Sequence, residues 1–136
     1  MKKTVKLLTL LLALIFALSL TACGRNPVTV DKDSVIITAR ASEYQIEGKK
    51  LLDFMETIRE DGKIDFTVKD GMITSVNGRE NGLSSFWMIY TDDTEYSNSA
   101  WGEVEYQGKK YFSASLGICE LPVKDGATYI LIYQSF

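Results

Sequence analysis

The segment 49–78 reads KKLLDFMETIREDGKIDFTVKDGMITSVNG, and its hydrophobic period changes partway along. In its first half, four apolar residues recur at i, i+3, i+4 and i+7, which places them on one stripe of a helix: Leu51, Phe54, Met55 and Ile58. Gly62 follows at the position that suits the left-handed conformation often found just after a helix. The first half therefore predicts an amphipathic helix over residues 49–60.

The second half of the same segment has a period of two. The apolar residues Ile64, Phe66 and Val68 alternate with polar ones, as expected for a strand with one buried face. The Asp-Gly dipeptide at 70–71 suits a two-residue hairpin turn, so the return strand is expected at 72–76.

Strand signals continue on both sides of this segment. The expected strands are short, rich in β-branched and aromatic residues, and bounded by turn dipeptides: 35–39, 85–91, 104–106, 111–115 and 129–133. The strand at 85–91 carries apolar residues on both faces and is expected to be central. One helix among several strands predicts an α+β domain in which the helix packs on a mixed or antiparallel sheet.

The N-terminal residues carry the pattern of a secretory signal. Three lysines within the first six residues precede an apolar run at 7–20, which is interrupted only by one Thr and one Ser. This run of 14 residues is short for a transmembrane helix, which needs about 20. Residues 1–22 are therefore expected to be a signal peptide that takes no part in the fold.

The apolar run ends in LTACG at residues 20–24, which resembles the bacterial lipobox. The resemblance implies that the Cys23 sulfur receives a diacylglyceryl group and that the chain is cut before Cys23. Two acyl chains anchor a protein firmly, whereas one binds only marginally. This predicts a protein held by lipid on the extracytoplasmic face of the cell membrane, with 23–32 as a lipidated tether and 33–136 as the domain that the tether carries. An uncleaved signal anchor with an incidental cysteine is the alternative.

Charge and composition exclude several classes of function. The sequence has 15 basic and 18 acidic residues, and loss of three lysines with the signal peptide changes the net charge from −3 to −6. An acidic body does not favour binding to nucleic acid or to anionic lipid headgroups. The chain has no histidine, the most common general base and transition-metal ligand. It also lacks a phosphate-binding glycine loop and a nucleophile elbow, so we expect a non-enzymatic protein without cofactor or metal.

Two features leave alternatives open. Cys119 has no intramolecular partner once Cys23 carries the lipid, and its apolar neighbours favour a small buried side chain over a reactive thiol. Asp92, Asp93 and Glu95 form the densest acidic stretch and offer the oxygen ligands that calcium prefers, but their spacing does not match an EF-hand loop. A hydrated loop is the expected interpretation, and a calcium site is the alternative.

Four stretches, taken in order, resemble the domain of unknown function 4430, a family similar to the C-terminal β-domain of transcobalamin and intrinsic factor: KLLDFM at 50–55, DGMITSVNG at 70–78, FWMIY at 86–90 and VKDGA at 123–127. The resemblance covers roughly residues 33–136 and implies a small β-grasp-like domain. The chain departs from the family at 91–95, where the family has Asn-Gly, and in a β-hairpin inserted at about 96–114. In the vitamin carriers this domain packs on one face of the corrin ring, so the resemblance implies a corrinoid or another flat apolar ligand.

Aromatic residues are concentrated in residues 86–112, which hold eight of the 15 in the chain. The candidate ligand-binding residues are Trp87, Tyr90, Tyr96, Trp101 and Tyr106. Strand alternation puts the first two on opposite faces, with Ile89 beside Trp87, whereas the other three lie in polar, turn-rich sequence. Exposed Trp and Tyr among polar neighbours are typical anchors for ligands or partners. The alternative is that they pack the inserted hairpin onto the sheet.

These observations predict a membrane-anchored extracytoplasmic lipoprotein that acts as a non-catalytic binding module. A corrinoid or other flat apolar ligand is the candidate, and a concave pocket with several aromatics would favour it. The alternative is a structural or interaction lipoprotein that docks onto another envelope protein such as a transporter, which a flat exposed apolar patch would favour.

Overall fold

The computed structural model of this protein describes residues 27–136, and the expected signal peptide and Cys23 lie outside the described residues. The elements are β1 (Val28–Val30), β2 (Ser34–Thr38), α2 (Leu51–Glu60), β3 (Phe66–Lys69), β4 (Met72–Val76), β5 (Arg79–Glu80), β6 (Ser85–Thr91), the 3₁₀ helix η1 (Thr94–Tyr96), β7 (Ser97–Tyr106), β8 (Lys109–Ala114) and β9 (Thr128–Ser135). Among residues 27–136, no helix is long and apolar enough to cross a membrane.

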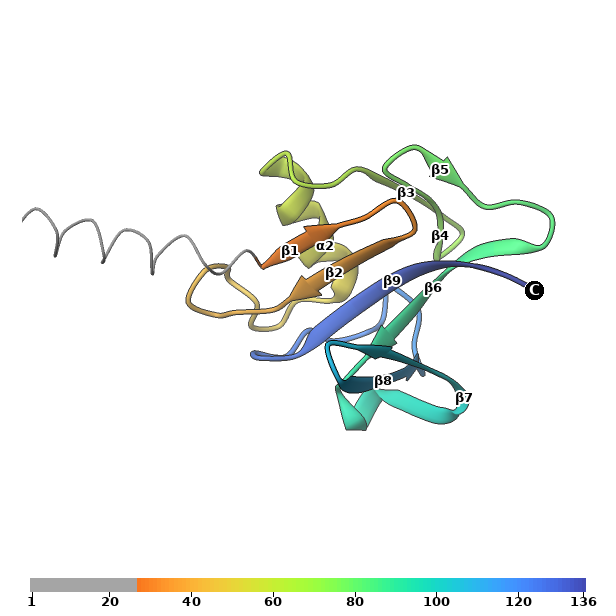
Figure 1. The fold of residues 1–136 in the computed structure, drawn as a ribbon. Helices are drawn as coiled ribbons and strands as arrows, with labels where there is room; N and C mark the ends of the chain where they lie inside the picture. The colour runs from red at the N-terminus through yellow and green to blue at the C-terminus, as the bar shows by residue number, and fades with distance from the viewer. Residues whose placement is uncertain (1–26) are drawn as a thin grey trace, which may run out of the picture.

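The strands form two antiparallel sheets (Figure 1). The large sheet has the order β1-β2-β9-β6-β8-β7, and the small sheet has the order β3-β4-β5. Every paired neighbour in both sheets runs antiparallel. The α+β class with one α-helix is confirmed for the described part of the chain, and of the two sheet types considered, antiparallel is correct.

The turn dipeptides explain where the hairpins form. At the β3–β4 turn, Asp70 has φ of 52° and Gly71 has φ of 78°. At the β7–β8 turn, Gln107 has φ of 50° and Gly108 has φ of 75°. Positive φ at both central residues is the requirement of a type I′ turn, whose twist matches that of the flanking strands. Both predicted hairpins are therefore confirmed.

Helix α2 forms over the predicted stripe and buries it completely. The main-chain N–H of Lys50 donates to the Asp53 carboxylate at 3.0 Å, which satisfies one free donor at the helix start. The four stripe residues are fully buried in one core with the inward side chains of the large sheet. Gly62 follows with φ of 73°, as expected for a residue that ends a helix.

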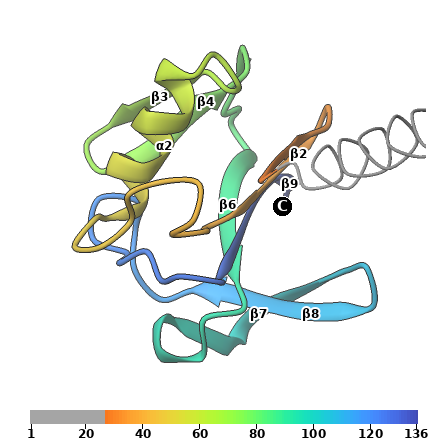
Figure 2. The ribbon, with the colours of Figure 1, turned by 90° about the vertical axis from the view of Figure 1, so that its left-hand side faces the viewer.

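The large sheet buries apolar side chains on both faces. Helix α2 and the small sheet cover the first face. The β7–β8 hairpin forms one edge of the large sheet and lies on the side of its other face (Figure 2). The core on the second face is built from Ile36, Tyr90, Tyr111 and Ile130. β6 serves both cores, because Trp87 packs in the first and Tyr90 in the second. The predicted alternation of this strand is confirmed.

The folded domain begins earlier than residue 33. Val28 pairs with Ile37 across β1 and β2, and its side chain is only 3% exposed in the first core. The segment 28–30 was expected to belong to the tether because it carries only two apolar residues. Pairing with β2 gives these residues a place at the edge of the large sheet.

Cys119 is exposed, so the prediction of a buried side chain was wrong. The carbonyl of Gly117 accepts from the N–H groups of both Glu120 and Leu121, which closes one tight turn. This turn directs Ile118 and Leu121 into the first core and leaves Cys119 on the outside. The apolar neighbours in the sequence therefore report the burial of Ile118 rather than that of Cys119.

Ionisation of the buried Tyr129 phenol should make the free energy of unfolding depend on pH in the alkaline range. Its ring is fully buried, and its hydroxyl donates to the Pro122 carbonyl and accepts from the Lys124 N–H. Burial raises the pKa of the Tyr129 phenol above its ordinary value of 10.0. Its contribution to stability is therefore fully present below about pH 10 and is lost as pH rises through the folded-state pKa. In thermal melts between pH 9 and 12, we expect Tm to fall less steeply with pH in Tyr129→Phe than in the wild type. Equal slopes of Tm against pH for the two proteins would contradict this expectation.

Candidate binding groove

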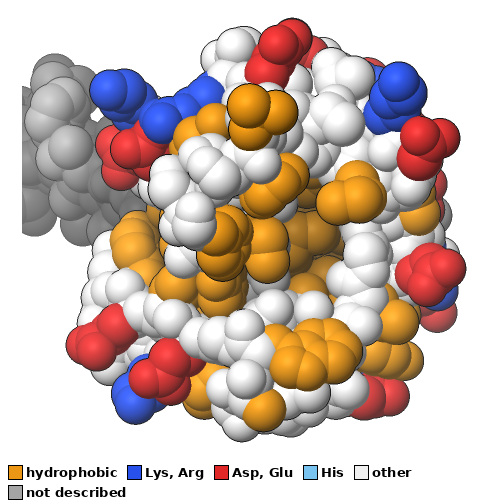
Figure 3. Space-filling view, turned by 90° about the vertical axis from the view of Figure 1, so that its right-hand side faces the viewer, with side chains coloured by type: hydrophobic (Ala, Val, Ile, Leu, Met, Phe, Trp, Pro, Cys, Tyr) orange, Lys and Arg blue, Asp and Glu red, His pale blue; other side chains and the backbone are white. Residues whose placement is uncertain are grey.

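An apolar groove of about 250 Å³ lies where the two sheets meet. Three segments line it: residues 71–73 at the start of β4, residues 87–89 of β6, and residues 113–118 at the end of β8 and in the turn beyond it. Figure 3 shows hydrophobic side chains gathered in a hollow on this face, with charged side chains farther out. The groove is therefore made by chain segments that lie far apart in the sequence.

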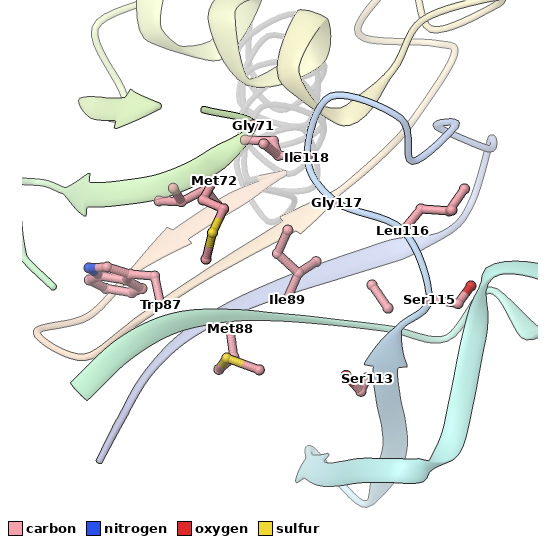
Figure 4. A pocket seen from close by; sticks show the side chains of 12 residues that line it. Gly71, Met72, Trp87, Met88, Ile89, Ser113, Ser115, Leu116, Gly117 and Ile118 are labelled. Atoms are coloured by element: carbon pink, nitrogen blue, oxygen red, sulfur yellow. The ribbon is translucent and has the colours of Figure 1, made fainter. Parts of the chain in front are cut away.

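The side chains of the groove differ in how firmly they are held. Trp87 is fixed, because its Nε1–H donates to the Arg79 carbonyl at 2.8 Å and its ring meets Tyr133 edge-on at 5.5 Å. Met72 is 62% exposed, and its thioether extends from β4 toward Ile89 (Figure 4). A flexible methionine beside a fixed indole gives a surface that can adapt to different apolar groups.

Asn81 holds the two sheets together at one end of the groove. Its side-chain N–H donates to the Ile73 carbonyl at 2.9 Å, and its side-chain oxygen accepts from the Trp87 N–H, also at 2.9 Å. Near the other end, Gly117 lies beside the Gly71 carbonyl, and a Cβ added to Gly117 would be in ordinary van der Waals contact with that oxygen at 3.5 Å. These two contacts join segments that line the groove.

None of the groove residues is charged. The polar side chains among them are Ser113 and Ser115, on the β8 side (Figure 4). The Met88 side chain points away and packs in the second core. The groove therefore presents hydroxyls and apolar surface to whatever enters it, and it offers no general acid or base.

No family model, no curated protein and no solved structure matches the chain. The resemblance to the domain of unknown function 4430 stays a prediction.

The five candidate aromatic residues do not form one site. Trp87 lines the groove. Tyr90 lies in the second core, and its hydroxyl donates to the Gln134 carboxamide oxygen at 2.6 Å. Tyr106 packs against the same core, whereas Tyr96 packs against the first core. Trp101 is 64% exposed in β7, outside the groove, where the pairing with β8 shifts between Asn98 and Glu103.

Sequence reasoning missed the apolar groove residues that are not aromatic. Met72, Leu116 and Ile118 line the groove, but each lies in a different local pattern. Met72 follows a hairpin turn, and the other two flank a glycine in the turn after β8. For Met72, the available signal was its position just after a hairpin turn, at the start of a strand.

Each carboxylate of the acidic stretch forms an ion pair with a lysine in the structure. The Asp92 carboxylate accepts from the Lys109 ammonium at 2.7 Å, and Lys124 bonds to both Asp93 and Glu95. The hydrogen bond with Glu95 raises the pKa of Lys124, and the same bond lowers the pKa of Glu95. Within the described residues, no group of three or more acidic, cysteine or histidine side chains is placed to hold a metal ion.

Proposed function

We propose that this protein is a lipoprotein anchored to the extracytoplasmic face of the membrane through Cys23, and that it is a non-catalytic binding module. The uncharged, concave apolar groove is the observation that supports a binding role. In this proposal, the domain presents the groove at the membrane surface and receives an apolar group of its ligand there. The absence of histidine in the chain and of any titratable group in the groove is why we assign no catalytic step.

The size of the groove limits the ligand. Small-molecule sites usually enclose about 300–1,000 Å³, and this groove has about 250 Å³. A corrinoid or other flat apolar ligand would therefore insert an edge rather than the whole ring. The β-grasp-like classification belongs to the same proposal, and the packing of α2 on one face of the large antiparallel sheet supports it.

A second candidate function is docking onto another envelope protein such as a transporter. Leu83 is fully exposed, and Phe136 is 74% exposed with its ring 6.3 Å from that of Phe86. This apolar group lies near the ends of β6 and β9, outside the groove. Exposed apolar side chains that cluster are typical of protein–protein contacts.

Fluorescence of residues 24–136 tests the primary proposal, because this range contains the whole described core. In a Trp101→Phe background, Trp87 is the only tryptophan and reports directly on the groove. The probes are N-phenylnaphthylamine, cyanocobalamin and haem. We expect at least one to bind saturably, and we expect Met72→Asp to weaken that binding by about tenfold because it places a charge in the apolar opening.

The matched control is Leu83→Asp, which makes the same chemical change at an exposed residue outside the groove. We expect this variant to bind as well as the parent protein. Equal weakening by both substitutions, or no saturable response to any probe from a protein that melts cooperatively, would overturn the proposed groove.

A further inference from the structure

One edge of β6 is paired over only part of its length. Toward β9, β6 is paired along all of Ser85–Thr91. Toward β8, the pairing is limited to Tyr90 with Ser113 and Thr91 with Phe112. In the part of the chain that the structure describes, no strand is paired with residues 87–89 on this edge, and these are the β6 residues that line the groove.

The main chain of this stretch points into the groove edge. The N–H of Trp87 donates to the Asn81 side chain, so the polar main-chain groups of Trp87 face away from β9. Alternate residues of an antiparallel strand direct these groups to the same edge. Ile89 therefore presents its main chain on this side as well.

Asn81 already acts as a short piece of strand between β6 and β4. Its carboxamide oxygen accepts from one strand, and its N–H donates to the other. A peptide group of an intervening strand would make the same two bonds, since its oxygen and N–H also point in opposite directions. The Trp87 N–H is therefore already bonded, and a strand that adds at this level would take the place of the Asn81 carboxamide.

The uncharged lining of the groove limits which ligand groups can bind there. The mature chain is acidic, but no Asp, Glu, Lys or Arg lines the groove. A charged ligand group would lose its hydration there without an ion-pair partner. The groove is complementary to a neutral segment whose polar groups are main-chain amides.

We propose that the occupant of the groove is an extended, uncharged peptide segment of a partner protein, which adds as a strand to β6 at residues 87–89. One apolar side chain of the segment enters between Met72 and Ile89. Strand addition of this kind takes affinity from main-chain hydrogen bonds and selectivity from the side-chain pocket. The open edge is about 7 Å long, so three residues of the partner occupy it. This inference rests on the proposed function, because it names the ligand class of the same groove.

The test uses the full lipidated chain in lipid nanodiscs, with an environment-sensitive fluorophore on Cys119. This thiol is exposed and adjoins Ile118, which lines the groove. The probes are blocked pentapeptides, Ac-Thr-Thr-X-Thr-Thr-amide, with Leu, Ile, Phe or Met at X, measured against empty nanodiscs. Each peptide is also made with single N-methylated amides, which remove one hydrogen-bond donor and leave the side chains unchanged.

We expect at least one peptide to bind saturably, and N-methylation to weaken it by about tenfold at alternate positions, because alternate N–H groups face the same edge. Equal binding by every methylated form overturns strand addition. Binding of N-phenylnaphthylamine by a protein that binds none of the four peptides also overturns it, but leaves the proposed function standing. If neither class binds, both proposals fail.

Discussion

Phe54→Ala should lower the free energy of unfolding by about 3–5 kcal/mol, the usual cost of removing a buried aromatic ring from a core. Phe54 is fully buried on the inner stripe of α2, and its ring meets Tyr44 edge-on at 5.4 Å. A domain of this size has a total stability of about 5–15 kcal/mol, so this is a large fraction of it. Urea unfolding of residues 24–136, followed by circular dichroism, measures the change directly.

Glu60→Ala is the matched control, because it truncates an exposed side chain on the same helix. We expect it to change stability by no more than about 0.5 kcal/mol. A loss of less than about 1 kcal/mol for Phe54→Ala would contradict the packing of α2 on the large sheet.

Cys23→Ser should abolish lipid attachment completely. The proposed anchor depends on a thioether bond to the Cys23 sulfur, and a serine hydroxyl cannot form that bond. Metabolic labelling with radioactive palmitate, followed by mass spectrometry of the mature N-terminus, measures the modification. Fractionation alone is a weaker readout, because an uncleaved apolar leader would still hold the chain at the membrane.

Cys119→Ser controls for the other thiol in the chain. Since the Cys119 side chain is exposed and lies within the folded domain, this variant should incorporate palmitate like the wild type. Loss of label in Cys119→Ser, or retained label in Cys23→Ser, would refute the lipobox interpretation.

The helix and hairpins could be predicted because their signals are local. The stripe of α2 occupies two turns of one segment, and each hairpin is set by two adjacent residues with positive φ. The strand order could not be predicted in this way. β9 pairs with β2 over residues separated by almost the whole domain, and no local pattern encodes such a pairing.

The groove could not be predicted from the sequence either, because it has no local pattern. It is formed where residues 71–73, 87–89 and 113–118 meet, and only tertiary packing brings them together. The aromatic residues were a poor guide, because Tyr90 serves a core and Trp101 lies outside the groove. Of the five candidates, Trp87 alone lines the groove, and its alternation within β6 was predictable.

The position of β9 also bears on when this protein folds. β9 is the last strand in the chain, but it lies between β2 and β6 in the large sheet. The β1–β2 part and the β6–β8–β7 part of that sheet cannot join until β9 has been made, so completing the sheet depends on contacts between distant parts of the chain. A narrow export channel passes a chain that has not yet folded. For a protein exported as we propose, the topology itself leaves the large sheet incomplete until β9 has followed the earlier strands across the membrane.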